Sequence, residues 1–368
     1  MSMYKIKKIQ ALTSILAIGV ASHASAVSFN VGDYEASVYG YVRLNMAYDF
    51  DESIGGGAQN GLFPKLNDSG STGEFNATAN QSRIGVSIKK ENGPKVVVEG
   101  DFYTGTMRLR HAYGEYKGLL AGQYWSNYNS FVASTPTLDF NGLVGVPGLQ
   151  HREPQLRYTN GKFSVSIEDP RSGFNSANGA ALKQSSPAFT ARYESRANGG
   201  GVSFGALAKQ NTHDNGVSDD STFAYAVFGA GKVAIAENVS IQGSINYSDG
   251  ANKYLYQSYA DDAYLDASGS LQNITGYAGQ LGATFKLDGG DRINLGVGMA
   301  KVDWDDAVAD GIAVNSKSEL NRNIIINYQW TPVKDVMFGV EVSNWYKEKV
   351  DGTDTSANRL MFAAQYNF

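Results

Sequence analysis

The sequence contains no cysteine, only 8 prolines and no long apolar run among its 368 residues. Without thiols the chain can form neither a disulfide framework nor a thiolate metal site. No apolar stretch of the mature chain approaches the ~18 residues that a transmembrane helix requires, and the acidic net charge of −5 argues against nucleic acid as a partner. Glycine (42) and tyrosine (22) are abundant instead, which is typical of β-strands joined by many turns.

Residues 1–26 have the pattern of a secretory signal peptide. Lys5, Lys7 and Lys8 form a basic region, Ala11–Ala21 an apolar core, and Ala24 to Ala26 a small-residue cleavage site. The core is too short to span a bilayer. Removal of this segment takes three lysines and no acid, so the charge of the predicted mature domain, residues 27–368, becomes −5 − 3 = −8.

The mature sequence alternates apolar and polar residues in runs of roughly ten, as the strands of a transmembrane barrel do. In 239–247, for example, Val, Ile, Gly, Ile and Tyr share one face, and Ser, Gln, Ser and Asn the other. We predict 16 strands, an even number as closed bacterial barrels have: 37–48, 80–90, 95–104, 107–116, 119–125, 154–159, 162–169, 188–195, 201–210, 221–233, 239–247, 274–287, 291–302, 316–330, 335–346 and 357–368. Leu360, Phe362, Tyr366 and the terminal Phe368 form an apolar row that resembles the assembly signal of outer-membrane barrels.

Short and long connections alternate along the chain, except for a short link at 105–106. This sorting is expected of a transmembrane barrel with short periplasmic turns and long outer loops. The longest loop without a clear period in the centre of the chain is 126–153, and loops of that length are usually functional. Basic residues flank it on both sides (Arg108, Arg110, Arg152 and Arg157). We therefore predict that it folds inward as the constriction of a pore.

Two hairpins predict a register. With a two-residue turn at 105–106, the cross-strand pairs are Asp101–Arg110, Tyr103–Arg108, Phe102–Leu109 and Val98–Tyr113, and His111 faces outward. With a turn at Asn160–Gly161, a typical hairpin sequence, the pairs are Tyr158–Phe163, Leu156–Val165 and Arg157–Ser164.

The candidate pore residues are charged and lie on the predicted lumen face or in the inward loop: Arg43, Arg83, Glu99, Asp101, Arg108, Arg110, Asp139, Arg152 and Arg157. One interpretation is a lattice of salt bridges that keeps a water-filled wall rigid. The other is an anion path, because guanidinium groups bind carboxylates with two parallel hydrogen bonds. Arg108 and Arg157 have no acid across their predicted hairpins and are the preferred ligands.

The remaining motifs are weaker. Acidic outer loops, such as Asp261–Asp262 and Asp303–Asp306, are either solvated or sites for calcium or for bridging to lipopolysaccharide. Aromatic pairs at strand ends, among them Tyr124–Trp125 and Trp345–Tyr346, are expected in the interfacial belts. No catalytic, metal or nucleotide motif is present in the sequence, so no cofactor is expected.

Four stretches resemble the DcaP-like family of trimeric outer-membrane porins: EGDFY at 99–103, LRHAYGEYKGLLAGQYWSNY at 109–128, TLDFNG at 137–142 and QLRYT at 155–159. The resemblance implies a 16-stranded homotrimer that passes small hydrophilic, preferably anionic solutes such as dicarboxylates. It also implies that Arg108, Arg110 and Arg157 line the pore. Some members carry a helical N-terminal extension, whereas only 27–36 precede the first predicted strand in this chain.

The sequence thus predicts an all-β transmembrane barrel in the outer membrane of a Gram-negative bacterium, surrounded by lipid and lipopolysaccharide. The expected function is passive diffusion of small anionic solutes, without catalysis. Two alternatives remain open: a barrel that hydrolyses lipids, and an adhesin or receptor with a plugged lumen.

Overall fold

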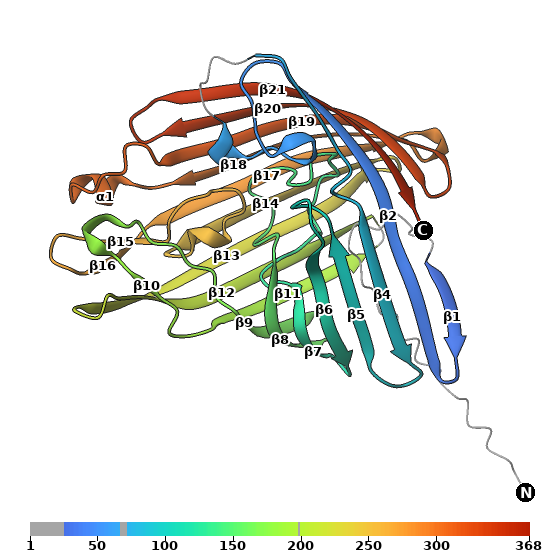
Figure 1. Cartoon of the computed structure of the whole chain (residues 1–368), viewed down its shortest axis with the longest axis horizontal. Coiled ribbons are helices and arrows are strands. Elements are labelled where there is room, and N and C mark those ends of the chain that lie inside the picture. The colour runs from blue at the N-terminus through green and yellow to red at the C-terminus, as the bar shows by residue number, and fades with distance from the viewer. Residues whose placement is uncertain (1–25, 67–71, 198) are drawn as a thin grey trace, which may run out of the picture.

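The computed structural model describes residues 26–66, 72–197 and 199–368, so the predicted signal peptide lies almost entirely outside the described residues. Strands that follow one another along the chain pair antiparallel, and β21 (Asp354–Asn367) pairs with β2 (Tyr34–Asp49) to close the sheet (Figure 1). The result is a closed 16-stranded antiparallel β-barrel, which confirms the fold and the strand number predicted from alternation.

One wall strand is interrupted, so that β3 and β4 occupy a single position beside β2. The other wall strands follow in chain order: β3 (Glu74–Thr78) with β4 (Arg83–Lys90), β5 (Lys95–Asp101), β6 (Arg108–Tyr116), β7 (Leu119–Trp125), β8 (Arg152–Asn160), β9 (Phe163–Glu168), β11 (Ala188–Ala197), β12 (Gly200–Asp214), β13 (Asp219–Ala236), β14 (Val239–Asp249), β17 (Thr275–Lys286), β18 (Arg292–Val302), β19 (Ser318–Val333) and β20 (Val336–Lys349).

Shorter elements occupy the connections: β10 (Leu182–Lys183), β15 (Ala263–Leu265), β16 (Leu271–Asn273), the 3-10 turns η1 (Gly57–Gln59), η2 (Phe63–Lys65), η3 (Ala177–Gly179), η4 (Asn252–Tyr254) and η5 (Asp288–Gly290), and α1 (Asp305–Ala309). None of the helices in the described part of the chain is long and apolar enough to cross a membrane. An unexpected strand, β1 (Val27–Val31), pairs with the start of β2 at the end of the barrel that carries the short turns.

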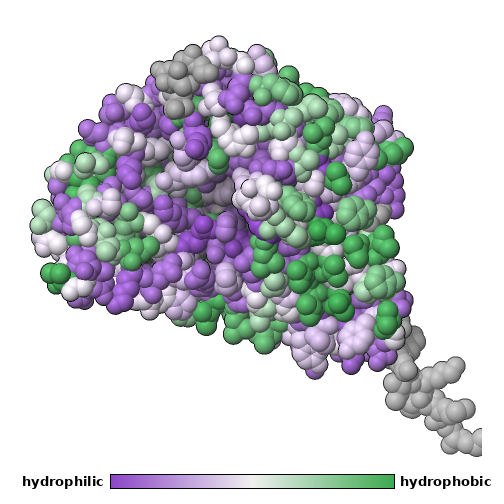
Figure 2. All heavy atoms as spheres, viewed as in Figure 1, coloured by the Kyte–Doolittle hydropathy of each residue, from purple (hydrophilic) through white to green (hydrophobic). Residues whose placement is uncertain are grey.

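The wall has an apolar outer face and a polar inner face. In β14, Ile245 is 75% exposed, whereas Gln242 on the opposite face is 1% exposed. Apolar side chains such as Val86 and Val98 gather on the face built by β4 to β6, where Figure 2 shows a continuous hydrophobic area. This is the reverse of a soluble protein, since the polar side chains lie within and the apolar ones outside.

The predicted register of the second hairpin is wrong by two residues. Asn160 pairs with Phe163, and Arg157 lies opposite Ser166 rather than Ser164. The turn therefore consists of Gly161 and Lys162, with Gly161 in the left-handed conformation at φ 60°. Because side chains alternate with a period of two, a shift of two residues keeps every side chain on its predicted face.

Candidate functional site: a constriction inside the barrel

The segment between β7 and β8, residues 126–151, lies inside the barrel; we call it the inner loop. Its backbone is hydrogen-bonded to side chains of the far wall: Asn323 accepts from Val144 N at 3.0 Å, and Ser244 donates to Gly145 O at 2.9 Å. Leu143 and Val144 are buried against that wall. Both ends of the loop leave the same side of the barrel, so the loop crosses the lumen and returns.

Glycines on the inner face of β17 and β18 allow the inner loop to touch the wall itself. A Cβ at Gly298 would lie 2.1 Å from the carbonyl oxygen of Val144, and one at Gly296 would lie 2.4 Å from a methyl group of Leu143. Any larger residue at these two positions would push the loop away from the wall. The loop and these glycines, far apart in sequence, therefore form one packed unit.

Two carboxylates hold the tip of the inner loop. Glu341 of β20 accepts hydrogen bonds from Leu138 N at 2.6 Å, from Asp139 N at 3.0 Å and from the Asn327 amide at 3.0 Å. Asp139 itself accepts from Asn141 N at 2.8 Å. Burial raises the pKa of Asp139 to about 6. The predicted site residue Asp139 is thus an anchor of the loop.

A second segment, residues 50–66, also folds into the lumen and meets the inner loop. Gly61 N donates to the Asp139 carboxylate at 2.7 Å. Phe63 is buried and packs against Trp345, with ring centroids 4.8 Å apart. Trp345 is therefore a core residue inside the barrel, and its predicted place in an interfacial belt is wrong.

Facing the inner loop, β4, β5 and β6 carry a network of five charged residues. Arg110 bridges both acids, with Nε 2.7 Å from Glu99 and Nη1 2.8 Å from Asp101. Arg83 Nε lies 3.3 Å from Glu99, and Arg108 Nε lies 2.6 Å from Asp101. The side chains of Arg83 and Arg108 are 21% and 33% exposed, so this network forms part of the inner surface.

The predicted register of the hairpin that carries this network is wrong. Asp101 pairs with Arg108, and a β-bulge places both Arg110 and His111 opposite Glu99. An extra residue in one strand inverts the faces beyond it. His111, predicted outward, is consequently 6% exposed inside the barrel, and Arg108, predicted to lack an acid across the hairpin, is ion-paired with Asp101.

Arg152, at the start of β8, differs from the arginines of the network because no carboxylate of the described residues pairs with it. Its guanidinium lies over the ring of Trp125 at 3.5 Å from the ring centroid. Nε and Nη2 are buried and have no hydrogen-bond partner among the described residues. Trp125 also stacks edge-on with Phe131 of the inner loop at 5.0 Å. The expectation that Trp125 anchors an interfacial belt is therefore wrong; it faces the lumen.

The other two predicted site residues are held by amide and carbonyl oxygens. Arg157 donates to the Gln155 side chain at 2.8 Å and to the carbonyl of Trp125. Arg43 donates to the carbonyl of Leu138 at 2.7 Å, so it anchors the tip of the inner loop together with Glu341 and Asp139. The structure arranges the predicted residues in three groups. These are the network of Arg83, Glu99, Asp101, Arg108 and Arg110; Arg152 and Arg157, which both contact Trp125, through its ring and its carbonyl; and Arg43 with Asp139 at the tip of the loop.

Aromatic rings cover this charged wall. The sequence predicted Tyr103 opposite Arg108 on the lumen face but did not place Phe140 there. The Arg108 guanidinium lies 4.2 Å from the centroid of Tyr103 and that of Arg110 5.8 Å from Phe140 of the inner loop. Tyr103 and Phe140 contact each other at 5.0 Å. Guanidinium groups stack favourably on aromatic faces. The sequence signal was the nearness of Tyr103 to the Arg residues, but the contact with Phe140 depends on how the loop folds.

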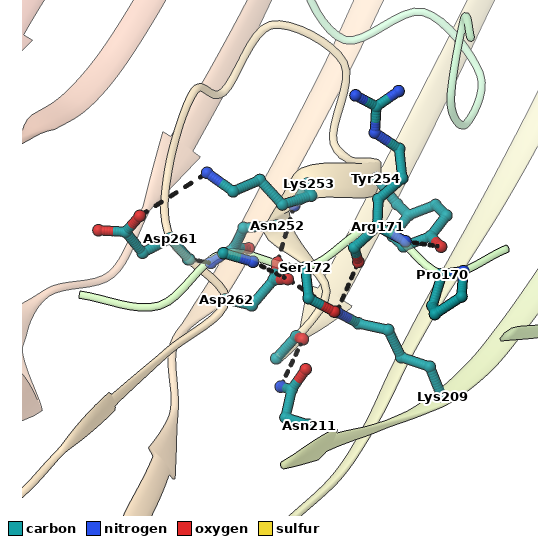
Figure 3. Close-up of polar contacts among 12 residues, drawn as sticks. Pro170, Arg171, Ser172, Lys209, Asn211, Asn252, Lys253, Tyr254, Asp261 and Asp262 are labelled. Carbon is teal, nitrogen blue, oxygen red and sulfur yellow. Dashed lines mark hydrogen bonds and ion pairs between the residues drawn. The ribbon is translucent and has the colours of Figure 1, made fainter. Parts of the chain in front are cut away.

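Two outer loops are latched to the inside of the barrel by a buried ion pair (Figure 3). Lys209 of β12 contacts Asp262 at 2.7 Å, and neither side chain is exposed. Lys209 also donates to the carbonyl of Arg171 at 2.8 Å, and the Tyr254 hydroxyl accepts from Arg171 N at 2.9 Å (Figure 3). Burial raises the pKa of Asp262. This latch (Lys209–Asp262) joins the loops 169–187 and 250–274 over the long-loop end.

The pair Asp261–Asp262 is therefore bound by lysines, since Asp261 contacts Lys317 at 2.7 Å. In the described part of the chain no group of three or more His, Asp and Glu side chains is arranged to hold a metal ion.

The sequence matches the DcaP outer membrane protein family over residues 22–368. The chain belongs to this family. The crystal structure of the outer membrane channel DcaP of Acinetobacter baumannii is 26% identical, with a TM-score of 0.78, over 92% of this chain and 99% of that one. This DcaP family member is consequently an outer-membrane channel and not an enzyme.

More distant porins share the fold alone. An anion-selective porin from Comamonas acidovorans is 11% identical with a TM-score of 0.58, covering 91% of this chain and all (100%) of that one. Salmonella typhi OmpF, in complex with daunomycin, is 11% identical with a TM-score of 0.59, over 93% of this chain and 100% of its own. A comparison with curated protein sequences gave no match.

Proposed function

We propose that this channel passes small hydrophilic solutes by passive diffusion and prefers anions, dicarboxylates among them. The charge of the constriction supports this. On the wall that faces the inner loop, four arginines (Arg83, Arg108, Arg110 and Arg152) lie against two acids, Glu99 and Asp101. Positive rings in a narrow pore favour anions because the low-dielectric walls strengthen the field.

The single observation that carries the proposal is the state of Arg152. The Arg152 guanidinium lies over the Trp125 ring, and two of its buried nitrogens, Nε and Nη2, have no hydrogen-bond partner among the described residues. A buried donor without an acceptor costs about 1–3 kcal/mol. A carboxylate beside Nε and Nη2 would accept from both N–H groups at once, in the bidentate geometry that arginine favours. The five-residue network beside it has its acids already paired and supplies the background positive charge.

Reversal potentials measured across planar bilayers under a salt gradient test this proposal. We expect anion preference in the wild type and a weaker one in Arg152→Ala. One unit charge at about 4 Å is worth about 1 kcal/mol in water, so the ratio of anion to cation permeability should fall roughly fivefold. Arg322→Ala is the matched control, because Arg322 also stacks on a ring, Tyr346 at 4.7 Å, but is exposed on the outer face. Cation preference in the wild type, or an unchanged ratio in Arg152→Ala, would contradict the proposal.

We further propose that the channel is a homotrimer whose contacts lie on β5 to β9. These strands are short: β5 and β7 have 7 residues and β9 has 6, whereas β13 has 18. Seven residues at ~3.3 Å each, tilted by about 40°, span roughly 18 Å, less than the ~25 Å apolar band of such barrels. A neighbouring copy covering this low wall would remove the mismatch, and lipid and lipopolysaccharide would contact the taller remainder.

The trimer is tested by measuring mass in detergent. Val98→Asp combined with Leu109→Asp places charges on the low wall, where both side chains are about half exposed. We expect this variant to become monomeric. Ile245→Asp with Leu281→Asp makes the same change on the taller wall and should remain trimeric. A monomeric wild type, or equal behaviour of the two variants, would refute the proposed interface.

A further inference from the structure

A cavity of about 910 Å³ opens at the short-turn end of the barrel, below the inner loop. Its lining comes from the turns that follow β8, β11, β13 and β17 and from Val132 of the inner loop, which closes it from above. In an outer-membrane barrel the short turns face the periplasm. The cavity is therefore the periplasmic vestibule of the channel, separate from the constriction described above.

The vestibule is strongly basic. Five basic and two acidic side chains line it: Lys162, Arg192, Arg196, Lys232 and Lys286, with Glu194 and Glu237. Glu194 is already engaged, since it accepts from Arg196 Nε at 2.8 Å and from Ser130 Oγ at 2.7 Å. Lys162, Lys232 and Lys286 have no ion-pair partner among residues 26–66, 72–197 and 199–368. An excess of three positive charges thus faces the vestibule.

Lys232 lies among other basic residues of the vestibule, since Arg196 and Lys286 line the same cavity. Independently, Nε of Arg192 is buried and has no hydrogen-bond partner in the described structure, although Arg192 lines the same cavity. Mutually repelling cations and an unpaired guanidinium N–H group are the features of a preformed anion site.

We infer that the periplasmic vestibule binds a compact polyanion, a linear di- or triphosphate. A phosphate group carries about −1.5 to −2 charges near neutral pH. A molecule with two or three linked phosphates therefore matches the three excess positive charges of the vestibule better than a carboxylate does. Lysine is a point charge on a flexible stem and can follow several phosphate oxygens, whereas Arg192 offers directed N–H groups. Because the site lies at the periplasmic mouth, a bound polyanion would obstruct the current from that side.

The inference rests on the proposed passage of ions through the lumen and is tested on the whole channel in planar bilayers. Inorganic tripolyphosphate is added to one chamber and then to the other. We expect block to be at least tenfold stronger from one side, and Lys232→Gln with Lys286→Gln to remove that stronger block, raising its half-blocking concentration by about tenfold or more. Higher ionic strength should weaken the block, and Lys232→Arg with Lys286→Arg should preserve it.

Lys117→Gln with Lys334→Gln is the matched control, because these lysines lie in other short turns and do not line the cavity. The control should be blocked like the wild type. Equal block from both sides, no block, or equal block in the Lys232/Lys286 variant and the wild type would overturn the inference. A protein that conducts nothing at all would instead contradict the proposed channel function, so the two failures are distinguishable.

Discussion

The anchoring of the inner loop by Glu341 leads to a prediction with a definite size. Glu341→Ala removes the acceptor of three hydrogen bonds, at 2.6, 3.0 and 3.0 Å, and leaves Leu138 N and Asp139 N without a partner in the docked loop. Hydrogen bonds to a charged group are worth about 1.5–3 kcal/mol each. The desolvation of the carboxylate, which the substitution relieves, offsets part of this sum.

A net loss of about 3 kcal/mol from docking is therefore expected. Since about 1.4 kcal/mol is a factor of ten, the population of the undocked loop tip should rise roughly a hundredfold. An undocked tip leaves the wall and enters the lumen, so single-channel recordings should show frequent brief closures. Glu341→Gln, which keeps one acceptor oxygen, should fall between Glu341→Ala and the wild type.

Glu348→Ala provides the control on the same strand, because Glu348 accepts from the Tyr346 hydroxyl at 3.2 Å and does not touch the inner loop. Its recordings should resemble those of the wild type. If a folded Glu341→Ala channel closes no more often than Glu348→Ala, the carboxylate does not hold the loop and the reasoning fails.

Three further predictions concern the same architecture. Gly298→Ala should lower the single-channel conductance, because its Cβ would displace the inner loop from the wall into the lumen; an unchanged conductance would show that the contact is not tight. Lys209→Met should make the outer loops sensitive to chymotrypsin, since it leaves Asp262 buried without its cation, which costs about 3–5 kcal/mol; the exposed pair of Lys183 gives the control Lys183→Met, which should change little. The raised pKa of Asp139 means that the folded state holds this proton more tightly than the unfolded state, so the contribution of Asp139 to stability should fall as pH rises from about 4 to about 6 and stay constant above; thermal unfolding across this range should show a slope that Asp139→Asn removes.

The sequence was sufficient to predict the barrel because the alternation of apolar and polar residues is a local property of each strand. Each strand must present apolar side chains to lipid and polar ones to water, and this requirement is written in every run of ten residues. The strand ends were correct to within a few residues in β7 and β17, where turn residues bound the pattern. The short strand β1 was missed because its role depends on pairing with β2 rather than on spanning the wall.

The pairing register of neighbouring strands was harder to predict from the sequence than the positions of the strands themselves. The bulge at Arg110 and His111 inserts one residue, and nothing in the local pattern distinguishes this from a regular strand with a two-residue turn. The consequence was functional: the bulge turned His111 inward and paired Arg108 with Asp101. The two ligands preferred from the sequence, Arg108 and Arg157, are ion-paired with Asp101 and hydrogen-bonded to Gln155, respectively. The proposed ligand is therefore Arg152, whose stacking on Trp125 depends on the path of the chain at the root of the loop.

Composition and alternation by themselves determined the fold class, the number of strands and the separation of an apolar outer face from a polar inner face. Only the tertiary structure decided which charged residues neutralise one another and which remain free. The reason is physical: alternation is imposed residue by residue by the membrane, whereas ion pairing depends on distances between strands far apart in the chain. Glu341 holding the tip of the inner loop, and Gly298 letting it touch the wall, exist only once the barrel is closed.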